Sequence, residues 1–143
     1  MISRQDAAYL VLVFCSFLLL ASFQLYVVTP LELKYSNSLA ALSSLFFLPH
    51  ALRIISAWLL GPKVLLALIP GHIVFQFMRF PDSSLLDFQM LAPIIVGSSA
   101  TLAFELFRIC GVNLYPNKLR ALHWRAMMLV GAVASVISSV GQA

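Results

Sequence analysis

The stretch FFLPHALRIISAWLLGPKVLLALIPGHI, residues 46–73, decides the fold. It consists of two apolar runs separated by a Gly-Pro pair at 61–62, which ends one helix and suits the first turn of the next. Each run carries a proline followed closely by a histidine, His50 in the first and His72 in the second, and the first run also contains Arg53. We therefore expect two membrane helices joined by a tight turn, with polar side chains buried inside them.

The composition of the whole chain agrees with a membrane protein. Hydrophobic residues make up 62% of the 143 residues and charged residues 10%, against about 45–50% and about 25% in soluble proteins. The net charge of +4 comes from basic residues that are scattered along the chain. They do not form the basic patch that is typical of a nucleic-acid-binding protein. The two cysteines stand in apolar runs without a metal or redox motif, so we expect free thiols.

The apolar runs predict an all-α, polytopic membrane helix bundle in which residues 1–143 form a single domain. A membrane helix needs about 20 mostly apolar residues, and the first run is longer than a signal-peptide core, so we expect it to be retained. Thr29-Pro30 is expected to end this first helix. The five expected helices span about residues 7–28, 39–60, 63–80, 88–110 and 122–140.

Basic residues near the helix ends predict the orientation of the bundle. One side carries Lys34 and Arg79 with nearby acidic residues, and the other side carries most of the remaining lysines and arginines. We therefore expect a cytoplasmic N-terminus, an external C-terminus and a location in a bacterial inner membrane. The expected cytoplasmic groups include Arg4, Lys63, Arg108 and a basic loop with Lys118, Arg120 and Arg125.

The two histidines lie at similar predicted depths. Counted from the turn at 61–62, His50 and His72 are each about 15–17 Å into the membrane. A pair of this kind could ligate a haem or a metal ion, or share a proton path. Alternatively, each histidine could satisfy a carbonyl group freed by the neighbouring proline. The sequence leaves both possibilities open and assigns no cofactor.

Arg53 needs a partner, because it lies too deep for its side chain to reach the lipid headgroups. Glu105 stands at a similar predicted height, so we expect an Arg53–Glu105 ion pair. The pair would either hold two helices together or form a site for an anion, a lipid headgroup or a quinone-like ligand. The chain has no nucleophile-base pair and no phosphate loop, and we therefore expect no enzymatic activity.

Two segments resemble the MASE1 type of integral membrane sensor domain. LPHALRIISAWLLGPKVLLALIPG, residues 48–71, is similar to the family's proline-containing helix ending in Leu-Leu-Gly, its basic turn and its next helix. APIIVGSSATLAFELFRICG, residues 92–111, resembles the following helix, and the match covers about residues 40–111. Members of that family have around eight spans and signal to a cytoplasmic output domain. The resemblance implies a shorter, stand-alone relative that senses by binding a partner.

Three functions remain open from the sequence. The first is a non-enzymatic accessory subunit or sensor-like module that binds a larger membrane protein complex or associates with itself. The second is a cofactor-binding or small-molecule-binding protein that uses His50, Arg53, His72 and Glu105. The third is a small transporter component. Kinked helices and intramembrane charges favour this function, although no inverted repeat is evident.

Overall fold

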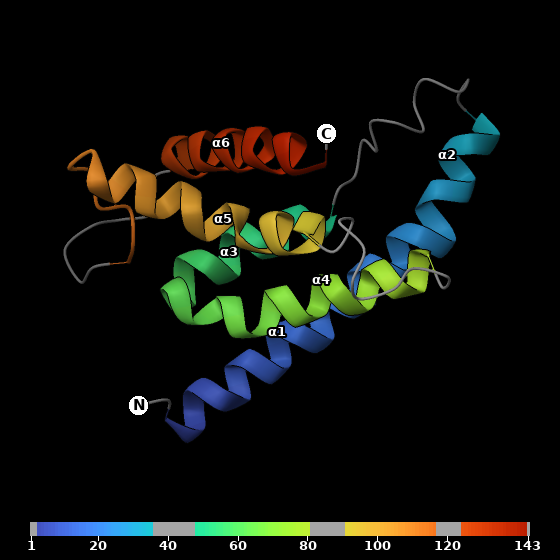
Figure 1. Cartoon of the computed structure of the whole chain (residues 1–143), viewed down its shortest axis with the longest axis horizontal. Helices are drawn as coiled ribbons and strands as arrows, with labels where there is room; N and C mark the ends of the chain where they lie inside the picture. The colour runs from blue at the N-terminus through green and yellow to red at the C-terminus, as the bar shows by residue number, and fades with distance from the viewer. Residues whose placement is uncertain (1–2, 36–47, 81–90, 117–123, 143) are drawn as a thin grey trace.

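The computed structural model describes residues 3–35, 48–80, 91–116 and 124–142, and within these ranges the chain forms helices and short turns without a strand (Figure 1). The elements in chain order are α1 (Arg4–Phe23), the π-helical segment η1 (Gln24–Val28), α2 (Thr29–Tyr35), α3 (Leu48–Leu60), the 3-10 turn η3 (Gly61–Val64), α4 (Leu65–Arg79), α5 (Leu91–Ile109) and α6 (Trp124–Gln142).

Three helical runs in the described residues are long and apolar enough to cross a membrane. They are Arg4–Leu31, Pro49–Arg79 and Leu91–Ile109, and Trp124–Val140 is a shorter apolar helix. The described residues confirm the expected all-α class, and the length and apolar composition of these runs are consistent with a membrane protein. Parts of the expected helices, residues 39–47, 88–90 and 122–123, lie outside the described residues.

The run Pro49–Arg79 is a helical hairpin. A straight helix would separate residues 53 and 72 by about 28 Å, yet Nη1 of Arg53 lies 3.5 Å from Nε2 of His72. The chain reverses at Gly61, whose φ of 61° is a left-handed conformation that favours glycine. Figure 1 shows α3 and α4 running in opposite directions from this turn, which confirms the break expected at residues 61–62.

The first helix continues beyond Thr29-Pro30, so the expected end there is wrong. The chain stays helical from Arg4 to Tyr35 through the π-helical segment η1. At the end of η1 the backbone N–H of Thr29 donates to the carbonyl of Gln24, and the Thr29 hydroxyl donates to the same oxygen at 2.9 Å. We attribute the continuation to the wider π turn, which relieves the clash between the ring of Pro30 and a carbonyl one turn earlier.

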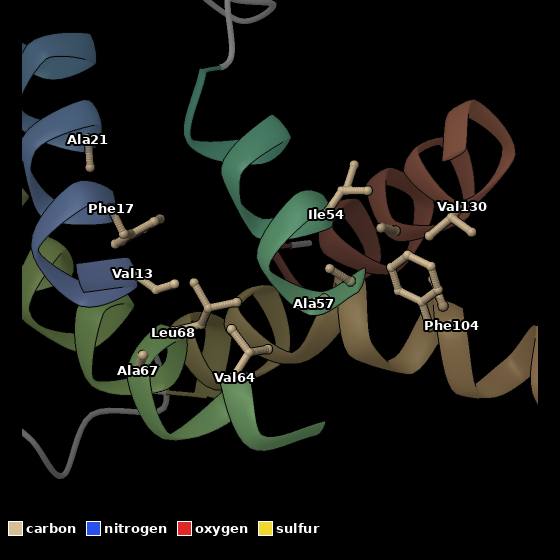
Figure 2. Close-up of a cluster of buried hydrophobic side chains, with 13 residues drawn as sticks. Val13, Phe17, Ala21, Ile54, Ala57, Val64, Ala67, Leu68, Phe104 and Val130 are labelled. Atoms are coloured by element: carbon tan, nitrogen blue, oxygen red, sulfur yellow. The ribbon is translucent and has the colours of Figure 1, made fainter. Parts of the chain in front are cut away.

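The core is built from small residues around a few large ones. Phe17 and Phe104 are the large aromatic side chains at its centre, and Figure 2 shows them facing smaller side chains from neighbouring helices. Because lipid supplies no hydrophobic drive between helices, close packing of this kind holds a bundle together in a membrane. The buried alanines are Ala21, Ala57, Ala67, Ala100, Ala103 and Ala134.

Helices α4 and α5 pack backbone against backbone at Gly97. A Cβ atom at this position would lie 3.3 Å from both the Cα of Ile69 and the carbonyl oxygen of Leu68. These neighbours are backbone atoms, which cannot rotate away. Gly97 therefore brings α4 and α5 near enough for polar contacts between them.

One end of the bundle contains the described segments that we expected on the cytoplasmic side. Lys63 of the η3 turn forms an ion pair with Asp6 of α1 at 2.8 Å. Trp58 of α3 donates through Nε1 to the carbonyl oxygen of Leu114, which follows α5. Figure 1 shows the start of α1, the η3 turn, the end of α5 and the start of α6 at this same end.

Replacing Gly97 with leucine should force α4 and α5 apart. We expect Gly97→Leu to lower the free energy of unfolding by about 1–3 kcal/mol, the usual range for overpacking, measured by SDS titration of the purified protein. Ala51→Leu is the matched control, because Ala51 is exposed on α3. Equal stability of the two variants would contradict the close contact at Gly97.

Candidate functional site

Arg53 is the centre of the polar site. Arg53 is only 1% exposed, although the arginine side chain is almost always charged. Nη1 donates to the carbonyl oxygen of Val96 at 2.7 Å, and Nη2 donates to Nδ1 of His50 at 2.6 Å. Nη1 also lies 3.5 Å from Nε2 of His72. The guanidinium group of α3 is thus held by acceptors from its own helix, from α4 and from α5.

The hydrogen bonds assign the tautomers of both histidines. Because a guanidinium group only donates, Nδ1 of His50 and Nε2 of His72 must be acceptors. Nδ1 of His72 lies 2.8 Å from the carbonyl oxygen of Leu68 and therefore carries the proton. Nε2 of His50 lies 3.3 Å from the carbonyl oxygen of Gly131, so this nitrogen carries the proton in His50. Both rings are neutral in this arrangement.

Two serines extend the network to α6. The Ser99 hydroxyl donates to the carbonyl oxygen of Val96 at 2.8 Å, and the Ser138 hydroxyl donates to Oγ of Ser99 at 3.0 Å. All these groups are buried. We call Arg53, His50, His72, Ser99, Ser138 and the Val96 carbonyl the Arg53 cluster.

The sequence analysis did not find the two serines of the cluster. Ser99 belongs to the apolar run of α5, and Ser138 is one of several small residues of α6. Serines are common in membrane helices, where their hydroxyls usually bond to their own helix, so the pattern carries no signal for a network between helices. The bond between the Ser99 and Ser138 hydroxyls depends on the packing of α5 against α6.

His72 is enclosed by contacts with several helices. Its ring stacks on Phe17 of α1, with 4.3 Å between the centroids and 29° between the planes. Its Nδ1 also lies where a side chain at Gly97 would reach. The residue is 7% exposed. His72 therefore joins α1, α4 and α5 around the guanidinium group of Arg53.

Glu105 does not pair with Arg53, which corrects the expected ion pair. Oε1 of Glu105 accepts from the hydroxyl of Tyr115 at 2.9 Å, and its carboxylate forms an ion pair with Arg108 at 3.2 Å. Arg53 lies level with Val96, nine residues before Glu105, which corresponds to about 13 Å along α5. The depth estimate failed because α5 extends past the η3 turn, so Glu105 lies at the end of the bundle.

In the observed arrangement, neither His50 nor His72 presents a nitrogen lone pair that could coordinate a haem iron. Two of their four ring nitrogens accept hydrogen bonds from Arg53, and the other two carry the protons directed at backbone carbonyls. A metal ion needs a nitrogen lone pair, so ligation would first require Arg53 to leave. Within the described residues, no group of three histidine, cysteine, aspartate or glutamate side chains is placed to hold a metal ion.

Only part of the expected basic loop belongs to the described residues. Lys118 and Arg120 lie outside the described residues. Arg125 is in the first turn of α6, where its guanidinium group lies 5.4 Å from the centroid of the Trp124 ring. It borders a shallow apolar groove between α5 and α6 that also includes Phe107 and Leu129. An arginine beside an exposed tryptophan is typical of a membrane–water interface.

Comparison with known proteins gives no match: no family model, no curated protein and no solved structure is similar to this chain. The resemblance to MASE1 sensor domains therefore stays a prediction from the sequence. The site has to be interpreted from its own geometry.

A double-mutant cycle distinguishes the two possible partners of Arg53. Arg53→Gln and Glu105→Gln should be additive in the free energy of unfolding to within about 0.5 kcal/mol, as distant sites are. Arg53→Gln and His50→Leu should couple by about 0.5–3 kcal/mol, because these side chains are in contact. Coupling of Arg53 to Glu105 but not to His50 would contradict the observed site.

Tyr115 provides a test by pH titration. Burial raises the pKa of its phenol, and the hydrogen bond to the Glu105 carboxylate raises it further, since a phenolate beside a carboxylate is disfavoured. We expect one of the four tyrosines to ionise clearly after the others in an absorbance titration at alkaline pH. Tyr115→Phe should remove this late component, and Glu105→Gln should shift it to lower pH. A late component that survives in Tyr115→Phe would contradict the assignment.

Proposed function

We propose that this chain is a non-enzymatic, multi-pass protein of a bacterial inner membrane that acts as an accessory subunit or sensor-like module of a larger membrane partner. In this proposal it has about five spans, with the N-terminus in the cytoplasm and the C-terminus outside. The hydrogen-bonded Arg53 cluster carries the proposal. The hydrogen bonds described above join its polar groups to one another, which favours a structural core over a ligand site.

The exterior of the helices supports association with another membrane protein. In the described residues, α6 contacts the bundle through Val130, Ala134 and Ser138, and its opposite face is exposed. The hydroxyl of Ser139 on this outer face, and that of Ser135 at its edge beside His50, donate to carbonyl oxygens of their own helix at 2.9 Å. A helix partner can therefore pack against the face without leaving a polar group unsatisfied.

The side chains of this face are large near the start of α6 and small further along it. Ala132, Ser135 and Ser139 are exposed along it, with Trp124 and Met128 nearer the interface. Small residues let two helix backbones approach closely, which is the main source of helix association in lipid. The same face would accept a larger membrane protein or a second copy of the chain. The resemblance to a sensor family favours the larger partner.

Site-specific photocrosslinking in the native membrane tests this function. A photoreactive amino acid at Ala132 should give a crosslinked product that contains one defined larger membrane protein, identified by mass spectrometry. Leu12 is the matched control, because it is exposed on α1. The same weak products from both positions would contradict docking through α6, and a product of two copies of the chain would show self-association instead.

A further inference from the structure

His50 connects the buried charge of Arg53 to α6. Its Nδ1 accepts from Arg53 at 2.6 Å, and its Nε2 faces the carbonyl oxygen of Gly131 at 3.3 Å and Oγ of Ser135 at 3.1 Å. One imidazole ring thus makes the contact inside α3 and the contact between α3 and α6. We propose that the Arg53 cluster is an acid-sensitive lock, which holds α6 in place against α3 while His50 is neutral and lets it shift away from α3 when His50 is protonated.

The chemistry of the Arg53–His50 bond makes it sensitive to acid. An imidazolium ion carries a proton on both nitrogens, so protonated His50 would direct an N–H group at the N–H groups of Arg53. Two positive charges would then face each other across 2.6 Å. Arginine does not give up its proton in proteins. The histidine must therefore move away from Arg53, and its contacts with Gly131 and Ser135 move with it.

Every helix around the cluster contributes a defined group. Within the part of the chain that the structure describes, the titratable and charged groups of the cluster are Arg53 and His50 from α3 and His72 from α4. The remaining contacts come from Phe17 of α1, the Val96 carbonyl and Ser99 of α5, and the Gly131 carbonyl, Ser135 and Ser138 of α6.

His50 is less enclosed by the other helices than His72. His50 is partly exposed and lies next to the exposed Ser135, whereas His72 is buried under the Phe17 ring. Histidine is also the side chain whose ordinary titration falls in the mildly acidic range. His50 is therefore the residue of the cluster that acid reaches first.

The packing of α6 on α3 leaves little room for such a movement. A Cβ at Gly131 would lie 3.1 Å from Cδ1 of Ile54, so the two helices are already close. Displacement of the His50 ring should therefore shift α6 as a unit. The biological consequence rests on the proposed function: if α6 is the docking helix, acid would weaken the complex with the partner.

A distance measurement on the isolated protein tests the lock without any partner. Spin labels would be placed at Ile55→Cys on α3 and Val136→Cys on α6, both exposed positions, after Cys15 and Cys110 are changed to serine. Between about pH 7.5 and about pH 4, a range that extends below the usual histidine titration because the charge of Arg53 opposes protonation, the distance distribution should shift to longer values. His50→Gln should abolish the shift, because its amide oxygen accepts from Arg53 and does not titrate. His123→Gln is the matched control and should shift like the parent protein.

An unchanged distance at both pH values would overturn the proposal, as would a full shift in His50→Gln. If His50→Gln does not fold, ¹⁵N spectra of histidine in the parent protein replace it: an imidazolium signal must appear over the same pH range as the distance change. Signals that change in a different range would also overturn the lock. Because no partner is present, failure here leaves the photocrosslinking test of α6 unaffected.

Discussion

A single buried charge governs the arrangement of these helices. A guanidinium group that is 1% exposed is tolerated only if hydrogen-bond acceptors surround it, because the loss of its hydration is costly. Here the acceptors are two neutral imidazoles and a backbone carbonyl, from three helices. The acceptors on α4 and α5 fix these two helices relative to Arg53 of α3, so satisfying the charge and aligning the three helices are the same requirement. This requirement explains the glycine at position 97, because α4 and α5 must come close at the level of Val96.

Residue types and local spacing predicted much of this architecture. The helix break at 61–62 and the burial of Arg53 and His72 follow from Gly-Pro chemistry and from the rule that polar groups in an apolar helix are enclosed by protein. The grouping of Lys63 with the start of the chain also matches the structure. These features depend on short stretches of sequence, where composition and periodicity carry direct information.

The partner of Arg53 could not be predicted in the same way. The sequence analysis paired it with Glu105 because opposite charges attract and the two depths seemed equal. That depth assumed that α5 ends level with the η3 turn, whereas α5 runs past it and Glu105 bonds to Tyr115 and Arg108. The backbone carbonyl of Val96 has no side-chain signature at all. The π turn before Pro30 was missed for a related reason, since a proline more often ends a helix than follows a widened turn.

The most direct test of this account is the protonation state of the histidines around Arg53. Nitrogen spectra of ¹⁵N-histidine-labelled protein in lipid bilayers at neutral pH, assigned with His50→Gln and His72→Gln variants, report which nitrogen carries the proton. The account predicts two neutral rings in opposite tautomers, protonated at Nε2 in His50 and at Nδ1 in His72. An imidazolium ion at either position, or the same tautomer at both, would contradict the arrangement in which both histidines accept from Arg53.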